Sequence, residues 1–216
     1  MRYKLAMFDM DGTILDTLQD LADATNAVMA MHGFPTHSVE AVRSFVGNGA
    51  LKLIQCAVPA GTDSAMIDTV LGDFKIYYGK HSADATKPYA GVPEMLRALR
   101  AAGIRTAVVS NKPDFAVKDL ADRYFSGLFD FAIGDREGIR KKPAPDSVLE
   151  VMKALGCTAA ESVYIGDSDV DVETAKNADV DGIFVNWGFR SVETLRTHGA
   201  EVIVGEPEEI TRLIMG

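Results

Sequence analysis

The sequence predicts an α/β protein in which a Rossmann-like parallel-sheet core carries a small inserted helical cap domain. Short apolar runs alternate with stretches of helical period, a pattern typical of a parallel sheet covered on both faces. A long block without a convincing strand follows the first apolar run, and it is too long for a loop. The chain has 216 residues, of which 47% are hydrophobic and 25% are charged. That length and composition fit one or two globular domains.

The strands of the core are expected at short apolar runs bounded by charged or turn-forming residues. The first run, which ends at Asp9, opens the sheet, and four similar runs follow it along the chain. The five expected strands are residues 5–8, 104–109, 163–165, 183–185 and 202–204.

Two helices of the core have clear boundaries in the sequence. The first lies between Gly91 and Gly103, with Pro93 suited to its first turn and Gly103 to a left-handed stop. The second covers residues 146–155 and ends at Gly156. We expect one apolar face on this second helix, formed by Val148, Leu149, Met152 and Leu155.

The inserted cap is expected at residues 17–85, between core segments 1–16 and 86–216. Its first helix shows an apolar stripe, with Asp16 or Thr17 as its N-cap. The two connections, near Asp16 and at residues 82–88, could act as hinges.

The overall charge limits the partners that this chain could bind. Acidic residues outnumber basic ones 31 to 22, which gives a net charge of −9 and disfavours nucleic acid or an anionic membrane. No apolar run reaches the length of a membrane span, and the start of the chain lacks the pattern of a signal peptide. Cys56 and Cys157 are too few for a disulfide framework and are expected to be buried free thiols. We therefore expect a cytoplasmic monomer or homodimer.

The strongest local motif is FDMDGTILDT at residues 8–17. Asp9 and Asp11 are two residues apart at the end of a strand, and Gly12 lets the chain turn there. Two carboxylates about 4 Å apart repel by about 4 kcal/mol at an effective dielectric constant of about 20. A divalent cation or a shared proton would relieve that repulsion. The alternative is an ordinary Asp-Gly turn with solvated carboxylates.

Three further segments place polar side chains after predicted strands or in the loops that follow. Ser110 and Asn111 could hold a phosphate oxygen, or could simply begin a helix. Lys141 and Lys142 precede a proline-stiffened loop, and each could be a solvated surface lysine. The segment at residues 167–171 carries Asp167, Asp169 and Asp171, which could bind magnesium or could be acidic residues at a helix N-terminus.

These four motifs, in this order, resemble the haloacid dehalogenase superfamily of phosphohydrolases. The resemblance covers nearly the whole chain and includes the helical insertion, which is similar to the small cap of that superfamily. Within it, residues 87–113 and 45–54 are similar to the phosphoglycolate phosphatase branch. Met10 stands where leucine is often found between the two acids, and this leaves the chemistry unchanged.

The resemblance implies roles for the core motifs. Asp9 would be the nucleophile that forms an aspartyl-phosphate, and Asp11 would protonate the leaving group and then activate water. Ser110 and the amide of Asn111 would bind the phosphoryl group. Lys142, rather than Lys141, would neutralise charge on Asp9 and on the phosphate.

The resemblance also implies a magnesium site. The carboxylate of Asp9, the backbone carbonyl of Asp11 and the carboxylate of Asp167 would bind Mg²⁺. Asp171 would support the metal through water or through Lys142, and Asp169 could be only an acidic residue at a helix N-terminus.

The cap is expected to determine which substrate is accepted. Asn48 and the amides around Gly47 and Gly49 could hold a small carboxylate, with Lys52 or Arg43 balancing its charge. The alternative is a glycine-containing helix start with basic residues on the surface. Trp187 and Phe189, after a core strand, are expected to have packing roles.

The function predicted from these observations is a Mg²⁺-dependent phosphatase for a small phosphorylated metabolite, with 2-phosphoglycolate the leading candidate. A phosphosugar mutase or sugar-phosphate phosphatase with the same core and cap is the alternative enzyme. A phospho-acceptor signalling module is a more distant alternative, because such modules combine similar residues but would have no use for the helical insertion.

Overall fold

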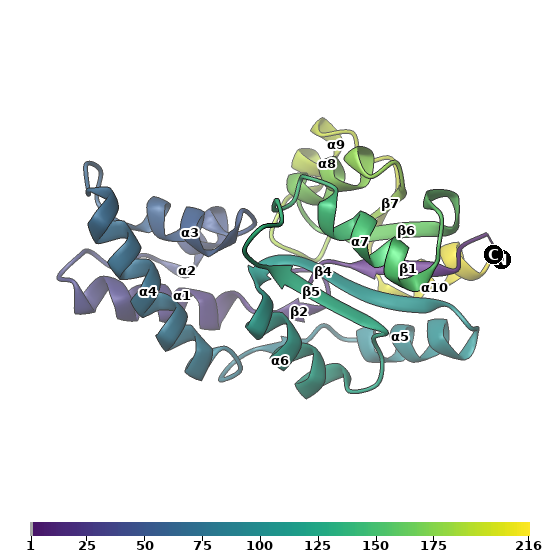
Figure 1. Ribbon diagram of the computed structural model, residues 1–216, viewed down its shortest axis with the longest axis horizontal. Helices are drawn as coiled ribbons and strands as arrows, with labels where there is room; N and C mark the ends of the chain where they lie inside the picture. The colour runs from purple at the N-terminus through teal and green to yellow at the C-terminus, as the bar shows by residue number, and fades with distance from the viewer. Residues whose placement is uncertain (1) are drawn as a thin grey trace.

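A computed structural model describes residues 2–216 and places six strands in one sheet. The strand order is β5-β4-β1-β6-β7-β8, and all neighbouring pairs are parallel (Figure 1). The strands are β1 (Leu5–Phe8), β4 (Arg105–Pro113), β5 (Phe131–Asp135), β6 (Ser162–Gly166), β7 (Asp181–Val185) and β8 (Ile203–Val204). The predicted α/β class is therefore confirmed. β4 extends four residues beyond the expected end, and β5 was not predicted.

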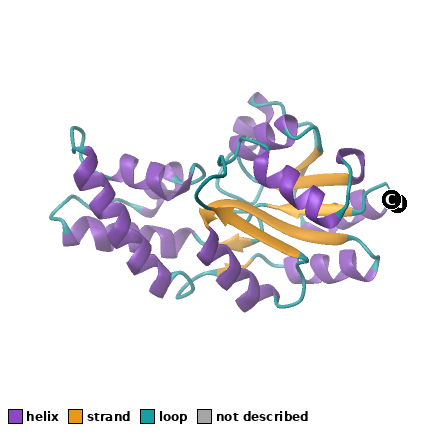
Figure 2. Cartoon of the chain, in the orientation of Figure 1, coloured by secondary structure: helices purple, strands orange, loops and turns teal. Residues whose placement is uncertain are grey.

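Helices cover both faces of the sheet (Figure 2). Successive residues of β1 alternate between the two faces, so Ala6 and Phe8 join one buried cluster while Leu5 and Met7 join the other. The first face packs against α5 (Val92–Ala101), α6 (Asp114–Phe125) and α10 (Pro207–Met215). The second face packs against α7 (Asp146–Leu155), α8 (Asp169–Asn177) and α9 (Val192–Thr197). A short 3₁₀ turn, Ala159–Glu161, leads into β6.

Two details of the predicted core are wrong. On α7, Leu149 is exposed, and the buried stripe is formed by Val148, Val151 and Met152. The stripe follows the i, i+3, i+4 spacing of a helix, which turns Leu149 away from the sheet. The two cysteines are free as expected, but both are partly exposed rather than buried.

Four helices lie between the first sheet strand and the rest of the core. They are α1 (Leu18–Met31), α2 (Val39–Phe45), α3 (Gly49–Ala57) and α4 (Ser64–His81). They surround a hydrophobic cluster of their own, and they form a block beside one end of the sheet (Figure 1). The predicted boundaries at residues 16/17 and 85/86 stay predictions. Along residues 2–216, no helix is both long and apolar enough to cross a membrane.

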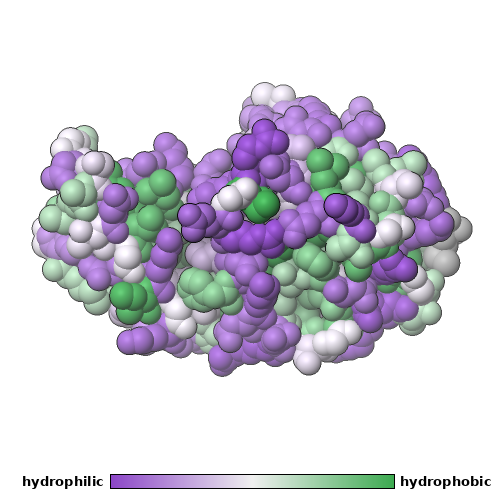
Figure 3. Space-filling model, viewed as in Figure 1, coloured by the Kyte–Doolittle hydropathy of each residue, from purple (hydrophilic) through white to green (hydrophobic). Residues whose placement is uncertain are grey.

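The two chain connections of this helical block run side by side. β2 (Leu15–Asp16) pairs antiparallel with β3 (Lys87–Pro88). Asp20, which is buried in the first turn of α1, accepts hydrogen bonds from the amides of Ala85 and Thr86, both at 2.8 Å. The block is thus fixed to the returning chain at its base. In the space-filling view polar residues cover most of this face, and the outline is indented where the block meets the core (Figure 3).

Candidate active site

The site begins at the carboxyl end of β1, where Asp9 is buried. Its amide donates to the carbonyl of Ile165 on β6 at 2.9 Å, and its Oδ1 accepts from the amide of Met10 at 2.7 Å. Gly12 follows at φ 82°, and a Cβ at this position would lie 2.5 Å from Oδ2 of Asp167. Glycine is therefore required here both by the left-handed backbone and by the close approach of the second acidic loop.

Lys142 lies against Asp9 and not in solvent. Its Nζ is 3.0 Å from Oδ1 of Asp9 and 2.8 Å from Oδ1 of Asp171, and it also donates to the hydroxyl of Tyr164 at 2.9 Å. Burial alone would lower the pKa of Lys142, but Asp171 and Asp9 raise it well above its usual value. Lys142 therefore stays charged beside the proposed nucleophile. Lys141 instead forms an ion pair with Asp135 at 2.8 Å.

Both oxygens of Asp171 are occupied by donors of the protein. Oδ1 accepts from Lys142 and from Tyr164, the latter at 3.2 Å. Oδ2 accepts from the amides of Asp167 and Ser168 at 3.1 and 3.0 Å, and from the hydroxyl of Ser168 at 2.7 Å. Of the two routes left open by the sequence, this arrangement favours support of the site through Lys142.

Asp167 faces Asp9 from the loop after β6. Its Oδ1 accepts from the hydroxyl of Thr13 at 2.9 Å, and its Oδ2 accepts from the amide of Phe189 at 2.7 Å. A Cβ on Gly188 would lie 2.3 Å from the Cβ of Asp167, so this loop can approach only because residue 188 is glycine. Phe189 therefore does more than pack, since its amide orients an acid of the site.

The acids form a cluster that suits a divalent cation. One carboxylate oxygen from each of Asp9, Asp167 and Asp171 lies within 4.8 Å of the others. Burial, with smaller contributions from neighbouring carboxylates, raises the pKa of Asp9 to about 6 and that of Asp167 to about 8. Such acids ionise readily only beside further positive charge, and all-oxygen ligands suit Mg²⁺. The residues present therefore fit a metal held by Asp9 and Asp167.

Ser110 and Asn111 lie near the end of β4, and both are buried. Ser110 is hydrogen-bonded to Asp9, which helps to lower the pKa of that acid. The side chain of Asn111 donates to the carbonyls of Gly47 and Lys142, each at 3.0 Å, and accepts from the amide of Lys142 at 2.9 Å. It thus fixes the lysine loop and contacts the helical block, roles that the sequence did not predict.

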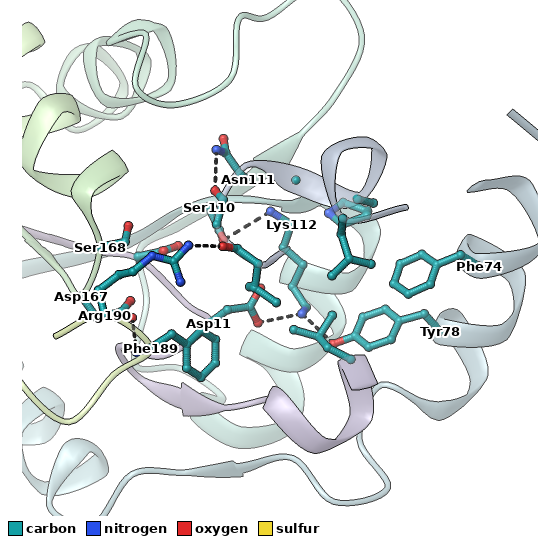
Figure 4. Close-up of a pocket in the computed structure, with 18 residues that line it drawn as sticks. Asp11, Phe74, Tyr78, Ser110, Asn111, Lys112, Asp167, Ser168, Phe189 and Arg190 are labelled. Atoms are coloured by element: carbon teal, nitrogen blue, oxygen red, sulfur yellow. Dashed lines mark hydrogen bonds and ion pairs between the residues drawn. The ribbon is translucent and has the colours of Figure 1, made fainter. Parts of the chain in front are cut away.

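Lys112 is a second buried lysine of the site, and the sequence analysis missed it. Its Nζ lies 2.7 Å from Oδ1 of Asp11 and donates to the hydroxyl of Tyr78 at 2.6 Å (Figure 4). Burial alone would lower the pKa of Lys112, but Asp11 and Tyr78 raise it above its usual value. The available signal was a third polar residue directly after Ser110 and Asn111, at the end of a strand whose middle is apolar. Thr17 is the N-cap residue of α1, one of the two residues expected there, but its hydroxyl donates to Asp11 at 2.7 Å and makes no capping hydrogen bond to the helix.

A pocket lies between these residues and the helical block. Gly47 and Gly49 line it, as predicted for the cap, together with the apolar side chains of Leu21, Val46, Leu53, Phe74 and Phe189. The other three residues predicted to contact substrate are not among those that line it. Asn48 and Lys52 are exposed, and Arg43 lies beside Glu40 at 3.3 Å.

Arg190 connects the loop after β7 with the helical block. Its guanidinium donates to the carbonyls of Arg43 and Val46, at 3.1 and 2.6 Å, and to Asp169 at 3.2 Å (Figure 4). Asp169 therefore has a partner beyond the start of α8, where Ser168 is the N-cap. Trp187 donates to the carbonyl of Thr13 at 3.1 Å.

The fold and the four loops at one sheet edge define a hydrolase core, and comparison with known proteins agrees. The chain belongs to the haloacid dehalogenase-like hydrolase family, whose profile matches residues 6–185. A phosphoglycolate phosphatase of Pseudomonas syringae pv. tomato is 34% identical over 99% of this chain and 79% of its own length. An N-acetylmuramic acid 6-phosphate phosphatase of Pseudomonas aeruginosa is 33% identical over 97% of this chain and 94% of its own.

A solved structure shows the same architecture. The crystal structure of a protein from Lactobacillus delbrueckii subsp. bulgaricus, provisionally assigned as a phosphoglycolate phosphatase, is 41% identical with a TM-score of 0.93. The match covers 99% of each chain. The resemblance predicted from the sequence, to the superfamily and to its phosphoglycolate phosphatase-like members, is confirmed, and so is the enzyme class, a hydrolase.

Proposed function

We propose that this chain is a phosphatase that hydrolyses a small phosphomonoester through an aspartyl-phosphate, with Mg²⁺ as cofactor and 2-phosphoglycolate as substrate. The contact of Asp9 with the buried Lys142, beside Asp167 and Ser110, carries the proposal. A carboxylate can attack an anionic phosphate only where positive charge surrounds both groups; Lys142 supplies part of that charge, and a divalent cation held by Asp9 and Asp167 would supply the rest.

The chemistry follows from the positions of the side chains. An oxygen of Asp9 attacks phosphorus in line with the leaving oxygen, and Lys142 balances the charge of Asp9 and the phosphoryl oxygens. Asp11 gives a proton to the leaving oxygen and later takes one from the water that cleaves the aspartyl-phosphate. Ser110 and the amide of Asn111 hold the phosphoryl oxygens. Mg²⁺, bound by Asp9, Asp167 and the Asp11 carbonyl, would supply further positive charge.

The substrate is proposed from the relatives and from the pocket. Phosphoglycolate phosphatases match nearly the whole chain, which favours a small substrate with a carboxylate. A sugar-phosphate phosphatase is the second candidate, because the Pseudomonas aeruginosa relative is named for an amino-sugar phosphate and the pocket has several apolar side chains. The hydrolase family favours either of these over a phospho-acceptor module.

A phosphate-release screen tests the proposal. The purified chain is assayed with 2-phosphoglycolate, N-acetylmuramic acid 6-phosphate, hexose phosphates and nucleotides, with Mg²⁺ or with EDTA. We expect Mg²⁺-dependent release with the highest kcat/KM on 2-phosphoglycolate. Preference for the amino-sugar phosphate would transfer the assignment to the second candidate, and full activity in EDTA would contradict the cofactor.

A fluoride mimic of the phosphoryl group tests the nucleophile separately. Beryllium fluoride with Mg²⁺ should be bound against the carboxylate of Asp9. A structure with the mimic bound elsewhere would contradict the covalent step while leaving the substrate assignment intact.

A further inference from the structure

Lys112 is buried at a point where the sheet and the helical block meet. Its side chain is 1% exposed, its Nζ is 2.7 Å from Oδ1 of Asp11, and it lies 4.6 Å from the centre of the Tyr78 ring. A buried ammonium without a partner is strongly destabilising, so the carboxylate of Asp11 is needed to hold it there. Lys112 in turn holds the carboxylate of Asp11, and Lys112 does not contact the cluster of Asp9, Asp167 and Asp171.

The hydrogen bonds of Asp11 distinguish its two oxygens. Oδ1 accepts from Lys112 and from the hydroxyl of Thr17, each at 2.7 Å. Two donors fill the two lone pairs of a carboxylate oxygen and fix the plane of the group. Within residues 2–216 no side chain or amide donates to Oδ2 of Asp11. Oδ2 is therefore the oxygen that remains for a proton exchanged with substrate or water.

Tyr78 connects this arrangement to the helical block. It lies on α4, its ring stacks on Phe74 with centroids 5.4 Å apart, and its hydroxyl accepts from Lys112 at 2.6 Å. Tyr78 and Phe74 both belong to the hydrophobic cluster of the block. The ammonium of Lys112 thus contacts both an acid of the core and a tyrosine of the block (Figure 4).

We propose that Lys112 is a positioning residue for Asp11, which it fixes through Oδ1 so that Oδ2 alone handles the proton. Tyr78 makes this alignment depend on the helical block lying against the sheet. The inference rests on the proposed function. As the phosphorus–oxygen bond of the substrate breaks, the Oδ2 proton goes to the leaving oxygen; in the second step Oδ2 takes a proton from the attacking water.

The two buried lysines thereby serve different acids. Lys142 contacts Asp9 and Asp171, whereas Lys112 contacts Asp11. Loss of Lys142 would impair the attack on phosphorus itself. Loss of Lys112 should impair only the steps in which Asp11 moves a proton.

Two substrates separate these effects. The leaving group of p-nitrophenyl phosphate is nitrophenolate, a weak base that departs without being protonated. The leaving group of 2-phosphoglycolate is an alkoxide, a strong base that needs a proton from a general acid. We expect Lys112→Met to lower kcat on 2-phosphoglycolate about 100-fold with little change in KM. On p-nitrophenyl phosphate, the same variant should release a rapid burst of one nitrophenolate per active site and then turn over slowly.

Three further variants provide reference values for the size of the nitrophenolate burst. Asp11→Asn should give the same burst without turnover, and Asp9→Asn should give none. Lys118→Met, at an exposed lysine paired with Asp114, is the matched control and should behave as the wild type. Circular dichroism checks that each variant is folded.

A milder pair of variants tests the connection to the block. Tyr78→Phe removes only the hydroxyl that Lys112 contacts, and we expect kcat to fall severalfold on 2-phosphoglycolate while the burst on p-nitrophenyl phosphate persists. Tyr77→Phe, at the neighbouring half-buried tyrosine that stacks on His81, should leave kcat unchanged.

The outcomes are distinct. Folded Lys112→Met protein with wild-type kcat on both substrates would overturn the inference, and so would loss of the burst, because Lys112 would then act in phosphoryl transfer itself. A wild-type protein that releases phosphate from neither substrate would instead reject the proposed function, and this inference with it.

Discussion

The carboxyl edge of the sheet and the helical block that faces it are built by different means. At the edge, acids and lysines hold one another: Asp9, Lys142 and Asp171 form one buried chain of ion pairs. The block faces the same pocket mainly with apolar side chains and with the backbone of Gly47 and Gly49. We therefore expect the reaction chemistry to depend on charge fixed by the core, and selectivity to depend on shape and position supplied by the block.

The largest expected effect comes from the core edge. Asp9→Asn removes the proposed nucleophile and keeps its size, so turnover should fall by about four orders of magnitude, about 5 kcal/mol in the barrier. Phosphate release from 2-phosphoglycolate measures it, and an unchanged melting temperature shows that the fold persists. Activity above one hundredth of wild type in a clean preparation would contradict the assignment.

A smaller loss of activity is expected from a substitution in the loop after β7, where Gly188 lies against Asp167. Gly188→Ala places a Cβ 2.3 Å from that of Asp167, so the loop must move and Asp167 must shift. We expect a higher Mg²⁺ requirement and about a tenfold lower kcat, measured by titrating Mg²⁺. Gly72→Ala, at a glycine without a positive φ where no atom lies within 4 Å of the new Cβ, controls for the substitution itself. Equal Mg²⁺ requirements in the two variants would count against this role of Asp167.

Substitutions that loosen the helical block should change KM for the substrate rather than kcat. Arg190→Ala removes the donors to the carbonyls of Arg43 and Val46, so the block is held less firmly. We expect KM to rise about tenfold with kcat changed little, whereas Arg97→Ala, at an exposed side chain of α5, should change neither. A fall in kcat without a change in KM would show that Arg190 serves the chemistry instead.

The buried acids should make the metal-free protein depend on pH. Because the folded pKa of Asp9 and of Asp167 is raised, to about 6 and about 8, their stabilising effect is full below about pH 4. It is lost as pH rises through the folded values. Asp167→Asn avoids ionisation at that position, so in EDTA its melting temperature should exceed that of the wild type by roughly 3 °C at pH 8, and not at pH 4.

Added Mg²⁺ should reverse this order at pH 8, because the ion stabilises only the protein that keeps its ligands. Asp23→Asn, at an exposed acid of α1, is the matched control. Equal melting temperatures of wild type and Asp167→Asn in EDTA across this pH range would contradict the burial argument.

The smallest effect is expected on the outer surface of the block. Lys52 is exposed and does not line the pocket, although the sequence analysis proposes that it balances a substrate carboxylate. The geometry predicts that Lys52→Met changes KM less than about twofold. A tenfold rise in KM would restore the role inferred from the sequence and would imply that the block moves on binding.

The sequence predicted the core better than the block for a physical reason. Asp9 and Asp167 directly follow strands, and Ser110 lies near the end of one. Parallel strands bring their carboxyl ends to one edge, so sequence position specifies spatial position. Lys112 was missed because its partner Asp11 is 101 residues away. Inspection of a short sequence motif cannot identify a partner that lies so far away along the chain.

The block lacks that constraint. Which face of α3 meets the pocket depends on helix packing, so the spacing around Gly47 and Gly49 could not indicate that these glycines line the pocket and Lys52 does not. Arg190 binds backbone carbonyls, and every residue offers a carbonyl. No residue type marks such a contact in the sequence.

The single tryptophan of the chain lies where these two regions join. The indole of Trp187 donates to the carbonyl of Thr13 in the loop after β1, and its ring is 6.4 Å from that of Tyr89, the residue after β3. Both neighbours belong to segments that connect core and block. The protein thus carries its single indole at this joint, and any movement of the block against the core would change the surroundings of that indole, so tryptophan emission can follow such a movement in real time without any attached label.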